Sequence, residues 1–162
     1  MSGLDDPAVQ ELWHAYVAAT GADAGSLGAV VQFGDSPAMA DELLELVLSG
    51  PKRATAGLLS DFTRAGEPVP AVGGHWIVTD GAGTPCAVLQ TTEIRVGPLD
   101  GVDDAFAWDE GEGDRTRNWW LAAHRRYFRR QGQRLGSAFD EAAEPVVFER
   151  FRVVWPPAHA DD

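Results

Sequence analysis

Lysine is almost absent from this chain of 162 residues. Lys52 is the only one among 13 basic residues, and the others are all arginine. An ammonium group is a compact charge whose pKa shifts readily on burial, whereas guanidinium stays protonated under any biological condition. A sequence that otherwise prefers arginine therefore indicates that position 52 needs a property that arginine lacks.

Cysteine and long apolar runs are also scarce. The single cysteine, Cys86, excludes an intrachain disulfide and a cysteine-based zinc cluster. No apolar run is long enough to span a bilayer. The first six residues lack the basic start and apolar core of a signal peptide. We therefore predict a cytoplasmic protein without a membrane partner.

Sequence motifs for metals and common cofactors are missing as well. The chain has no phosphate-binding glycine loop, serine-hydrolase elbow or dinucleotide fingerprint. The acidic segment 109–114 does not have the spacing of a calcium-binding EF-hand loop. The histidines also lack the spacing of zinc ligands; they are His14, His75, His124 and His159. We expect neither a bound metal nor a cofactor.

The formal net charge is −12, which argues against bulk, nonspecific binding of nucleic acid. Seven of the 13 basic residues nevertheless lie between Arg115 and Arg134. A local basic segment on an acidic protein suits a nucleoside, a nucleotide or a short RNA better than a long duplex. The sequence does not indicate an oligomeric state.

Local patterns predict an α+β protein, with a small, mostly antiparallel sheet or barrel decorated by helices. Helix signals, including capping residues and glycine stops, mark 6–20, 36–50, 103–108 and 117–135. Extended patterns cover 30–34, 52–56, 75–79, 86–96 and 145–155, and residues 58–62 are expected to lead into a polar loop. We predict an N-terminal helical extension (1–29), one domain (30–156) and a disordered tail (157–162).

Lys52 and Thr55 are candidates for catalysis because a threonine hydroxyl becomes a nucleophile when a base lies beside it. A hydrolytic site also needs a third group, and Glu110 or Glu112 in the acidic segment would supply a carboxylate. The alternative is structural: a helix end, then a strand with one snorkelling lysine, and a solvated acidic loop. On spacing alone, the structural interpretation is the stronger one.

The predicted helix 117–135 interleaves arginines with aromatic residues. Arginine pairs with phosphate, and aromatic faces stack on bases. The alternative is a core face containing Trp120, Tyr127 and Phe128, opposite a solvated arginine face. His124 lies on the apolar side, where it is a candidate hydrogen-bond donor or general acid.

Several motifs together resemble those of the bacterial ASCH domain family, over residues 30 to 155. They are Phe33-Gly34-Asp35-Ser36-Pro37, Ala40-Asp41-Glu42-Leu43, Gly50-Pro51-Lys52-Arg53-Ala54-Thr55-Ala56, Val78-Thr79-Asp80-Gly81, Thr91-Thr92-Glu93, Glu110-Gly111-Glu112-Gly113-Asp114-Arg115 and Phe148-Glu149-Arg150-Phe151. The resemblance implies a PUA-like fold, a small β-barrel with a cleft between barrel and helices, and a role in binding RNA or a nucleoside.

Some members of that family are amidohydrolases of N4-acetylcytidine, and others are ribonucleases. In the amidohydrolases the site is a lysine, a threonine three residues later and a downstream glutamate. This pattern maps onto Lys52, Thr55 and Glu110. The chain departs from the pattern at Pro51, where a basic residue is common, and in its N-terminal helix.

The resulting hypothesis is a metal-independent amidohydrolase of an N4-acylated cytidine-type nucleoside. Thr55 attacks the amide, Lys52 accepts its proton, and Glu110 positions Lys52. Substrate contacts are expected from Arg53, Glu112, Arg115, Trp119, His124 and Tyr127. One alternative is a ribonuclease that cleaves single-stranded RNA with Lys52, His124 and Arg115. Another is a noncatalytic RNA- or nucleotide-binding module in which Lys52 contacts phosphate.

Overall fold

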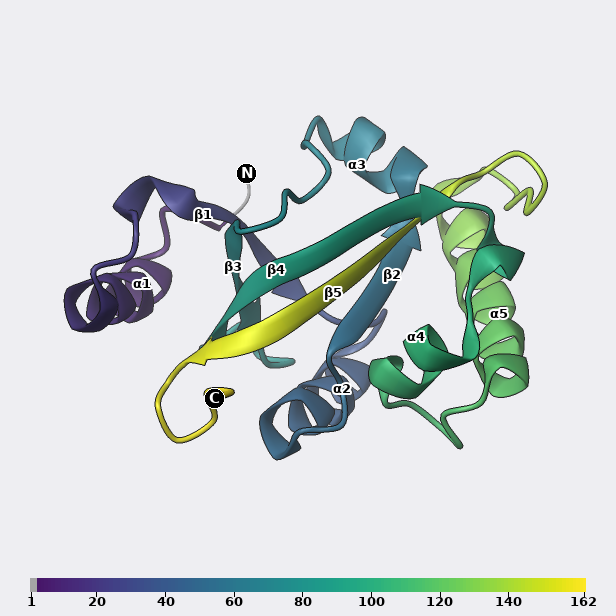
Figure 1. The fold of residues 1–162 in the computed structure, drawn as a ribbon. Helices are drawn as coiled ribbons and strands as arrows, with labels where there is room; N and C mark the ends of the chain where they lie inside the picture. Colours follow the sequence, from purple (N-terminus) through teal and green to yellow (C-terminus); the bar gives the residue numbers. More distant parts are fainter. Residues whose placement is uncertain (1–2) are drawn as a thin grey trace. The chain divides into compact units, whose positions relative to one another are not determined.

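A computed structural model describes residues 3–162, which form five α-helices, two short 3₁₀ helices and five strands (Figure 1). The chain divides into two compact units. Unit 1 comprises residues 1–50, 70–93 and 150–162, and unit 2 comprises residues 51–69 and 94–149. The two units are described in turn.

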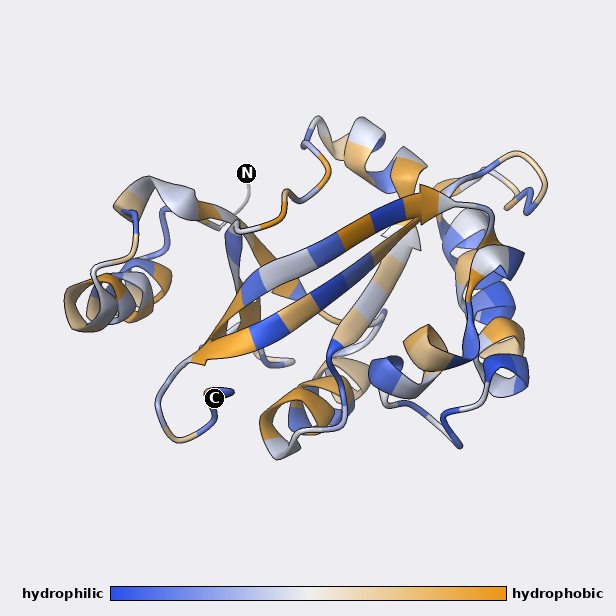
Figure 2. Ribbon diagram, viewed as in Figure 1, coloured by the Kyte–Doolittle hydropathy of each residue, from blue (hydrophilic) through white to orange (hydrophobic). Residues whose placement is uncertain are grey.

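The strands belong to one five-stranded sheet in the order β1-β3-β4-β5-β2. Strand β1 pairs in parallel with β3, and β3 pairs antiparallel with β4. The bounds are β1 Leu27–Gln32, β2 Ala54–Leu58, β3 His75–Thr79, β4 Pro85–Gly97 and β5 Val146–Trp155. Apolar residues occupy both ends of β5, and its charged residues lie in the middle of the strand (Figure 2). The predicted α+β class is confirmed.

Unit 1 packs two helices against its strands. Helix α1 (Pro7–Thr20) begins after Asp6, whose side chain accepts from a backbone N–H, and ends at Gly21. Helix α2 (Pro37–Ser49) begins in the same way after Ser36. Both helices were predicted, because a capping side chain followed by proline marks a helix start. Their buried residues pack on strand residues that include Trp76, Ile77, Val78 and Val88.

Unit 2 contains β2, α3 (Leu59–Ala65), a 3₁₀ turn (Leu99–Gly101), α4 (Asp104–Glu110) and α5 (Arg117–Leu135). Helix α5 has the predicted bounds, with Thr116 as its cap and Gly136 as its end. Residues 58–62 were given no secondary structure and were expected to lead into a polar loop; the structure forms α3 here, and the loop follows it. Leu58 provides no side-chain cap, so the local sequence carries no start signal for that helix.

Helix α4 has the predicted length of one or two turns but ends two residues later than the predicted 103–108. Asp103 caps its start by accepting from the Phe106 N–H at 2.7 Å, and the helix continues to Glu110. Asp109 and Glu110, which were assigned to the acidic loop, are therefore helical. Because Glu110 belongs to the helix, helix geometry fixes the position of its side chain.

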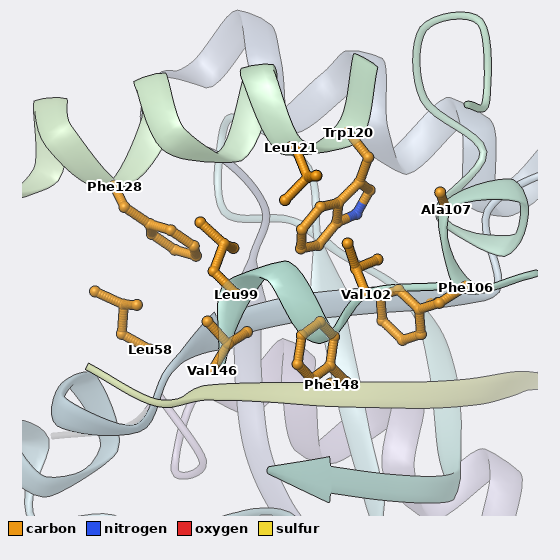
Figure 3. Packing of buried hydrophobic residues seen from close by; sticks show 11 residues of the cluster. Leu58, Leu99, Val102, Phe106, Ala107, Trp120, Leu121, Phe128, Val146 and Phe148 are labelled. Carbon is orange, nitrogen blue, oxygen red and sulfur yellow. The ribbon is translucent and has the colours of Figure 1, made fainter. Parts of the chain in front are cut away.

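The core of unit 2 lies between α5 and the adjoining strands. Trp120, Leu121 and Phe128 project from α5 toward Val146 and Phe148 of β5 (Figure 3). The predicted core face of α5 is therefore confirmed for Trp120 and Phe128, which are each 1% exposed. This packed face holds α5 in place and so positions the remaining side chains of the helix.

Candidate functional site

The Lys52 side chain is buried in unit 2, with only 1% of its surface exposed. Its Nζ donates to Glu110 Oε2 at 2.5 Å, to Glu112 Oε2 at 2.9 Å and to the carbonyl oxygen of Ala54 at 2.9 Å. The interpretation of Lys52 as a snorkelling surface residue is therefore wrong. Burial of a charge is costly unless it is paired and hydrogen-bonded, and Lys52 Nζ meets both conditions.

Two backbone features bring these residues together. The Arg53 N–H donates to the Asp109 carbonyl at 2.6 Å, which joins the segment before β2 to the last turn of α4. Gly111 ends α4 with φ +74, and a Cβ there would lie 2.7 Å from the carbonyl atoms of Pro51. Only glycine fits both the left-handed backbone and this close approach.

The two glutamates differ in exposure and in charge. The Glu110 side chain is 1% exposed and that of Glu112 is 19% exposed, so Glu112 forms the more open part of the cluster. Burial alone would raise the pKa of Glu110, but the Lys52 charge and a hydrogen bond from His124 outweigh it, and the pKa is lowered. Burial raises the pKa of Glu112, and the Glu110 charge adds to this against the opposing Lys52 charge, giving about 7.

Lys52 is held in its protonated form. Burial by itself would lower the Lys52 pKa, but the charges and hydrogen bonds of Glu110 and Glu112 outweigh burial and raise it. A base must be deprotonated at working pH. The structure thus favours Glu112, rather than Lys52, as the group of this cluster that exchanges a proton near neutrality.

His124 completes the cluster from α5. Its ring stacks on Trp120 with centroids 3.8 Å apart, and its Nδ1 lies 2.9 Å from the Trp120 carbonyl oxygen. A carbonyl only accepts, so Nδ1 carries a hydrogen. Nε2 faces Glu110 Oε1 at 3.4 Å, and the imidazole side chain is 12% exposed. His124 was predicted as a site residue, and the structure brings it to the predicted glutamate.

Thr55 follows Ala54 in β2, directly after the carbonyl that accepts from Lys52. Side chains alternate along a strand, and Ala54, Ala56 and Leu58 pack in the unit 2 core. The half-buried Thr55 side chain therefore points to the other face of β2. Its role as a nucleophile stays a prediction.

Three further residues were predicted to contact the substrate, and each lies in different surroundings: Arg53, Trp119 and Tyr127. Arg53 Nη1 donates to the Lys52 carbonyl at 2.7 Å, beside the cluster. Trp119 packs over Gly113, where a Cβ would lie 2.1 Å from the ring. The Tyr127 ring packs against Phe128, with centroids 5.7 Å apart. No structural observation assigns substrate contacts to these three residues, and that part of the hypothesis stays a prediction.

Arg115 lies on the turn that follows Glu112, and its N–H donates to the Glu112 carbonyl at 3.0 Å. Its guanidinium stacks 3.7 Å from the centroid of the Trp108 ring, and its Nε donates to the Trp108 carbonyl. Arg115 has φ 64, a left-handed conformation that is strained for a non-glycine residue. The exposed Trp108 was not predicted, because a lone tryptophan in a helical pattern gives no signal of such a stack.

Within residues 3–162, no group of three histidine, cysteine, aspartate or glutamate side chains is arranged to hold a metal ion. None of the helices in that range combines the length and apolar character needed to cross a bilayer.

Comparisons with known proteins identify a family for this chain. The family model described as ASCH domain matches residues 29–155. The structure of an ASCH domain from Lactobacillus crispatus JV V101 is similar, with a TM-score of 0.82 and 30% identity over 93% of this chain and 96% of that chain. A protein structure from Enterococcus faecalis V583 has a TM-score of 0.79 and 29% identity over 91% and 88% of the two chains. No curated protein sequence matched.

Proposed function

The chain belongs to the ASCH domain family, and we propose that it is a metal-independent amidohydrolase of N4-acylated cytidine-type nucleosides. The observation that carries this proposal is the buried cluster of Lys52, Glu110 and Glu112, with Thr55 three residues after Lys52 in the chain. It combines a fixed positive charge with a carboxyl group whose pKa is about 7. Groups that titrate near neutral pH at a partly open position are well suited to acid–base catalysis.

In the proposed reaction, the Thr55 hydroxyl oxygen attacks the carbonyl carbon of the substrate amide. Its proton moves to the Glu112 carboxylate, which acts as the base in place of Lys52. Lys52 remains an ammonium because two glutamates raise its pKa. When Glu112 takes up the proton, it loses its negative charge and its interaction with Lys52 weakens. A Nζ–H of Lys52 then becomes available to the developing oxyanion.

The tetrahedral intermediate collapses by breaking the carbon–nitrogen bond. Glu112 returns its proton to the leaving amine, which departs as cytidine, and an acyl ester remains on Thr55. Water then attacks this ester and gives its proton to Glu112; the bond between the acyl carbon and the threonine oxygen breaks, Glu112 returns the proton to that oxygen, and the carboxylic acid leaves. Glu110 keeps Lys52 in place throughout. Such division of roles between two carboxyl groups follows from their different environments.

The test is incubation with N4-acetylcytidine, with cytidine release followed by chromatography. Native protein should release cytidine, whereas Thr55→Ala, Glu112→Gln and Lys52→Arg should lose at least about 100-fold in kcat/KM. Arg64→Gln, at an exposed ion pair in the same unit, is the matched control and should keep full activity. Absence of cytidine from native protein at enzyme levels near those of the substrate would reject the proposal.

Two other outcomes would assign different functions to the same cluster. Cleavage of single-stranded RNA in chelator, lost in Lys52→Ala and His124→Ala, would identify a ribonuclease. Ligand binding that survives Lys52→Arg, with no turnover of either substrate, would identify a noncatalytic RNA or nucleotide sensor.

A further inference from the structure

Helix α1 precedes the part of the chain that matches the family model, and the proposed reaction does not use it. Its buried face packs in unit 1 against strand residues that include Ile77, which is fully buried. One titratable side chain lies in this apolar interface: His75 of β3, which is 7% exposed. The rings of Trp13 and Tyr16, both on α1, lie with their centroids 5.3 Å from that of the imidazole.

Both ring nitrogens of His75 are hydrogen-bonded. Nδ1 lies 2.9 Å from Oγ of Ser26, and Nε2 lies 3.0 Å from the hydroxyl oxygen of Tyr16. The Ser26 hydroxyl donates its one hydrogen to the Asp23 carbonyl at 2.6 Å, so Nδ1 donates to Ser26. Nε2 of the neutral ring is then an acceptor, and the Tyr16 hydroxyl donates to it. The neutral imidazole therefore joins α1, and the 3₁₀ turn that precedes β1, to β3.

A second proton on the ring would disrupt these bonds. It would occupy Nε2 and face the hydrogen of Tyr16, whose hydroxyl would then have to turn that hydrogen toward an apolar interior. The polar and charged groups around His75 are Tyr16 of α1, Asp23 and Ser26 before β1, Gln90 opposite it on β4, and Arg152 of β5.

The charged groups in this set do not favour a protonated ring. The Asp23 carboxylate accepts from the Gly25 N–H at 2.9 Å, and within residues 3–162 no carboxylate pairs with His75. Arg152 carries a positive charge, which repels a second one. Burial, and after it the Arg152 charge, lower the pKa of His75 below its ordinary value of 6.5.

We propose that His75 is an acid-sensitive latch that holds helix α1 on the strands of unit 1. Above about pH 6.5 the ring is neutral in both the docked and the undocked state, so α1 stays docked. Below that pH the undocked state, in which His75 reaches water, takes up a proton more readily than the docked state. Acid therefore favours undocking, which exposes the apolar surface that contains Ile77.

The experiment measures amide hydrogen exchange in native protein by mass spectrometry, at pH values from about 5 to 8. Protection factors correct for the intrinsic pH dependence of exchange. They are compared for peptides from α1 and from α2, which packs in a different hydrophobic cluster of unit 1. We expect protection of α1 to fall below about pH 6.5, by at most about 10-fold per pH unit, because undocking takes up one proton. Protection of α2 should not follow this fall.

Two variants assign the effect to the latch. His75→Gln removes the titrating ring, and it should make protection of α1 independent of pH over this range. Arg152→Gln removes the neighbouring charge at an exposed position and keeps the ring, so it should reduce the total loss of protection between about pH 7.5 and 5. The matched control is His14→Gln, which removes an exposed histidine from α1 and should behave like native protein.

Three results would overturn the proposal. They are protection of native α1 that does not change with pH, a pH dependence that survives His75→Gln, and an equal loss of protection in α2. If His75→Gln does not fold, Arg152→Gln decides, and a loss of protection as large as in native protein would count against the latch. None of these readouts involves turnover, so they remain separate from the test of the hydrolase.

Discussion

His124 directs its Nε2 toward Oε1 of Glu110 at 3.4 Å, while its Nδ1 bonds to the Trp120 carbonyl. This contact places the imidazole of α5 against the buried carboxylate that binds Lys52, so His124 links α5 to the Lys52 cluster.

Replacement of His124 should make the protein more sensitive to acid. The lowered pKa of Glu110 contributes stability that is present above the unfolded pKa of about 4.5 and is lost as pH falls toward the folded pKa. His124→Gln removes one cause of that lowering, so acid unfolding should begin at a higher pH. The free energy of unfolding at pH 7 should fall by about 1 kcal/mol, since one pKa unit corresponds to about 1.4 kcal/mol.

Circular dichroism during acid titration measures this effect. His14→Gln, at an exposed position on α1, is the control and should leave the unfolding midpoint unchanged. Identical midpoints in the two variants would mean that His124 does not stabilise the Glu110 carboxylate.

Gly111→Ala should destabilise the protein more than another substitution at a left-handed helix end. The added Cβ would meet the backbone of Pro51 and Lys52 at 2.7 to 2.9 Å. At Gly136, where φ is +72, a Cβ meets nothing within 4 Å. We expect Gly136→Ala to cost about 1 kcal/mol and Gly111→Ala at least about 2 kcal/mol more, measured by urea unfolding. Similar costs for both would show that the close approach at Gly111 is unimportant.

The pH profile of the proposed hydrolysis should report Glu112. If Glu112 is the base, kcat/KM rises with pH through about 7, where its carboxyl group ionises. The Glu110 charge helps to raise that pKa, so Glu110→Gln should move the rise to lower pH in whatever activity it retains. A profile unchanged by Glu110→Gln would contradict this coupling.

Stability should also depend on Glu112 between about pH 4.5 and 7. A carboxyl whose folded pKa is raised binds its proton more tightly in the folded state. Its contribution to the free energy of unfolding is therefore fully present below the unfolded pKa and is lost as pH rises through about 7. Thermal unfolding is measured across this range for native protein and for Glu112→Gln. The difference between their free energies of unfolding should decline as pH rises. A constant difference would place the Glu112 pKa near its ordinary value.

Local sequence signals were sufficient for much of the fold. Asp6, Ser36 and Thr116 cap helices because a side-chain oxygen satisfies backbone N–H groups that the helix leaves free, and this depends on neighbouring residues only. Strand β3 and its return in β4 were likewise marked by a turn between two apolar runs. Helix α3 was missed because no capping residue precedes it.

The single lysine pointed to position 52 from the sequence alone, and the resemblance to a family pointed to a glutamate partner. Composition could not show that both Glu110 and Glu112 bind the same amine, nor that Glu112 is the more exposed one. Those facts depend on where α4 ends and on the close approach that Gly111 permits. Charge states in the cluster are set by burial and by neighbours 58 and 60 residues away in the chain, so only the tertiary structure decides them.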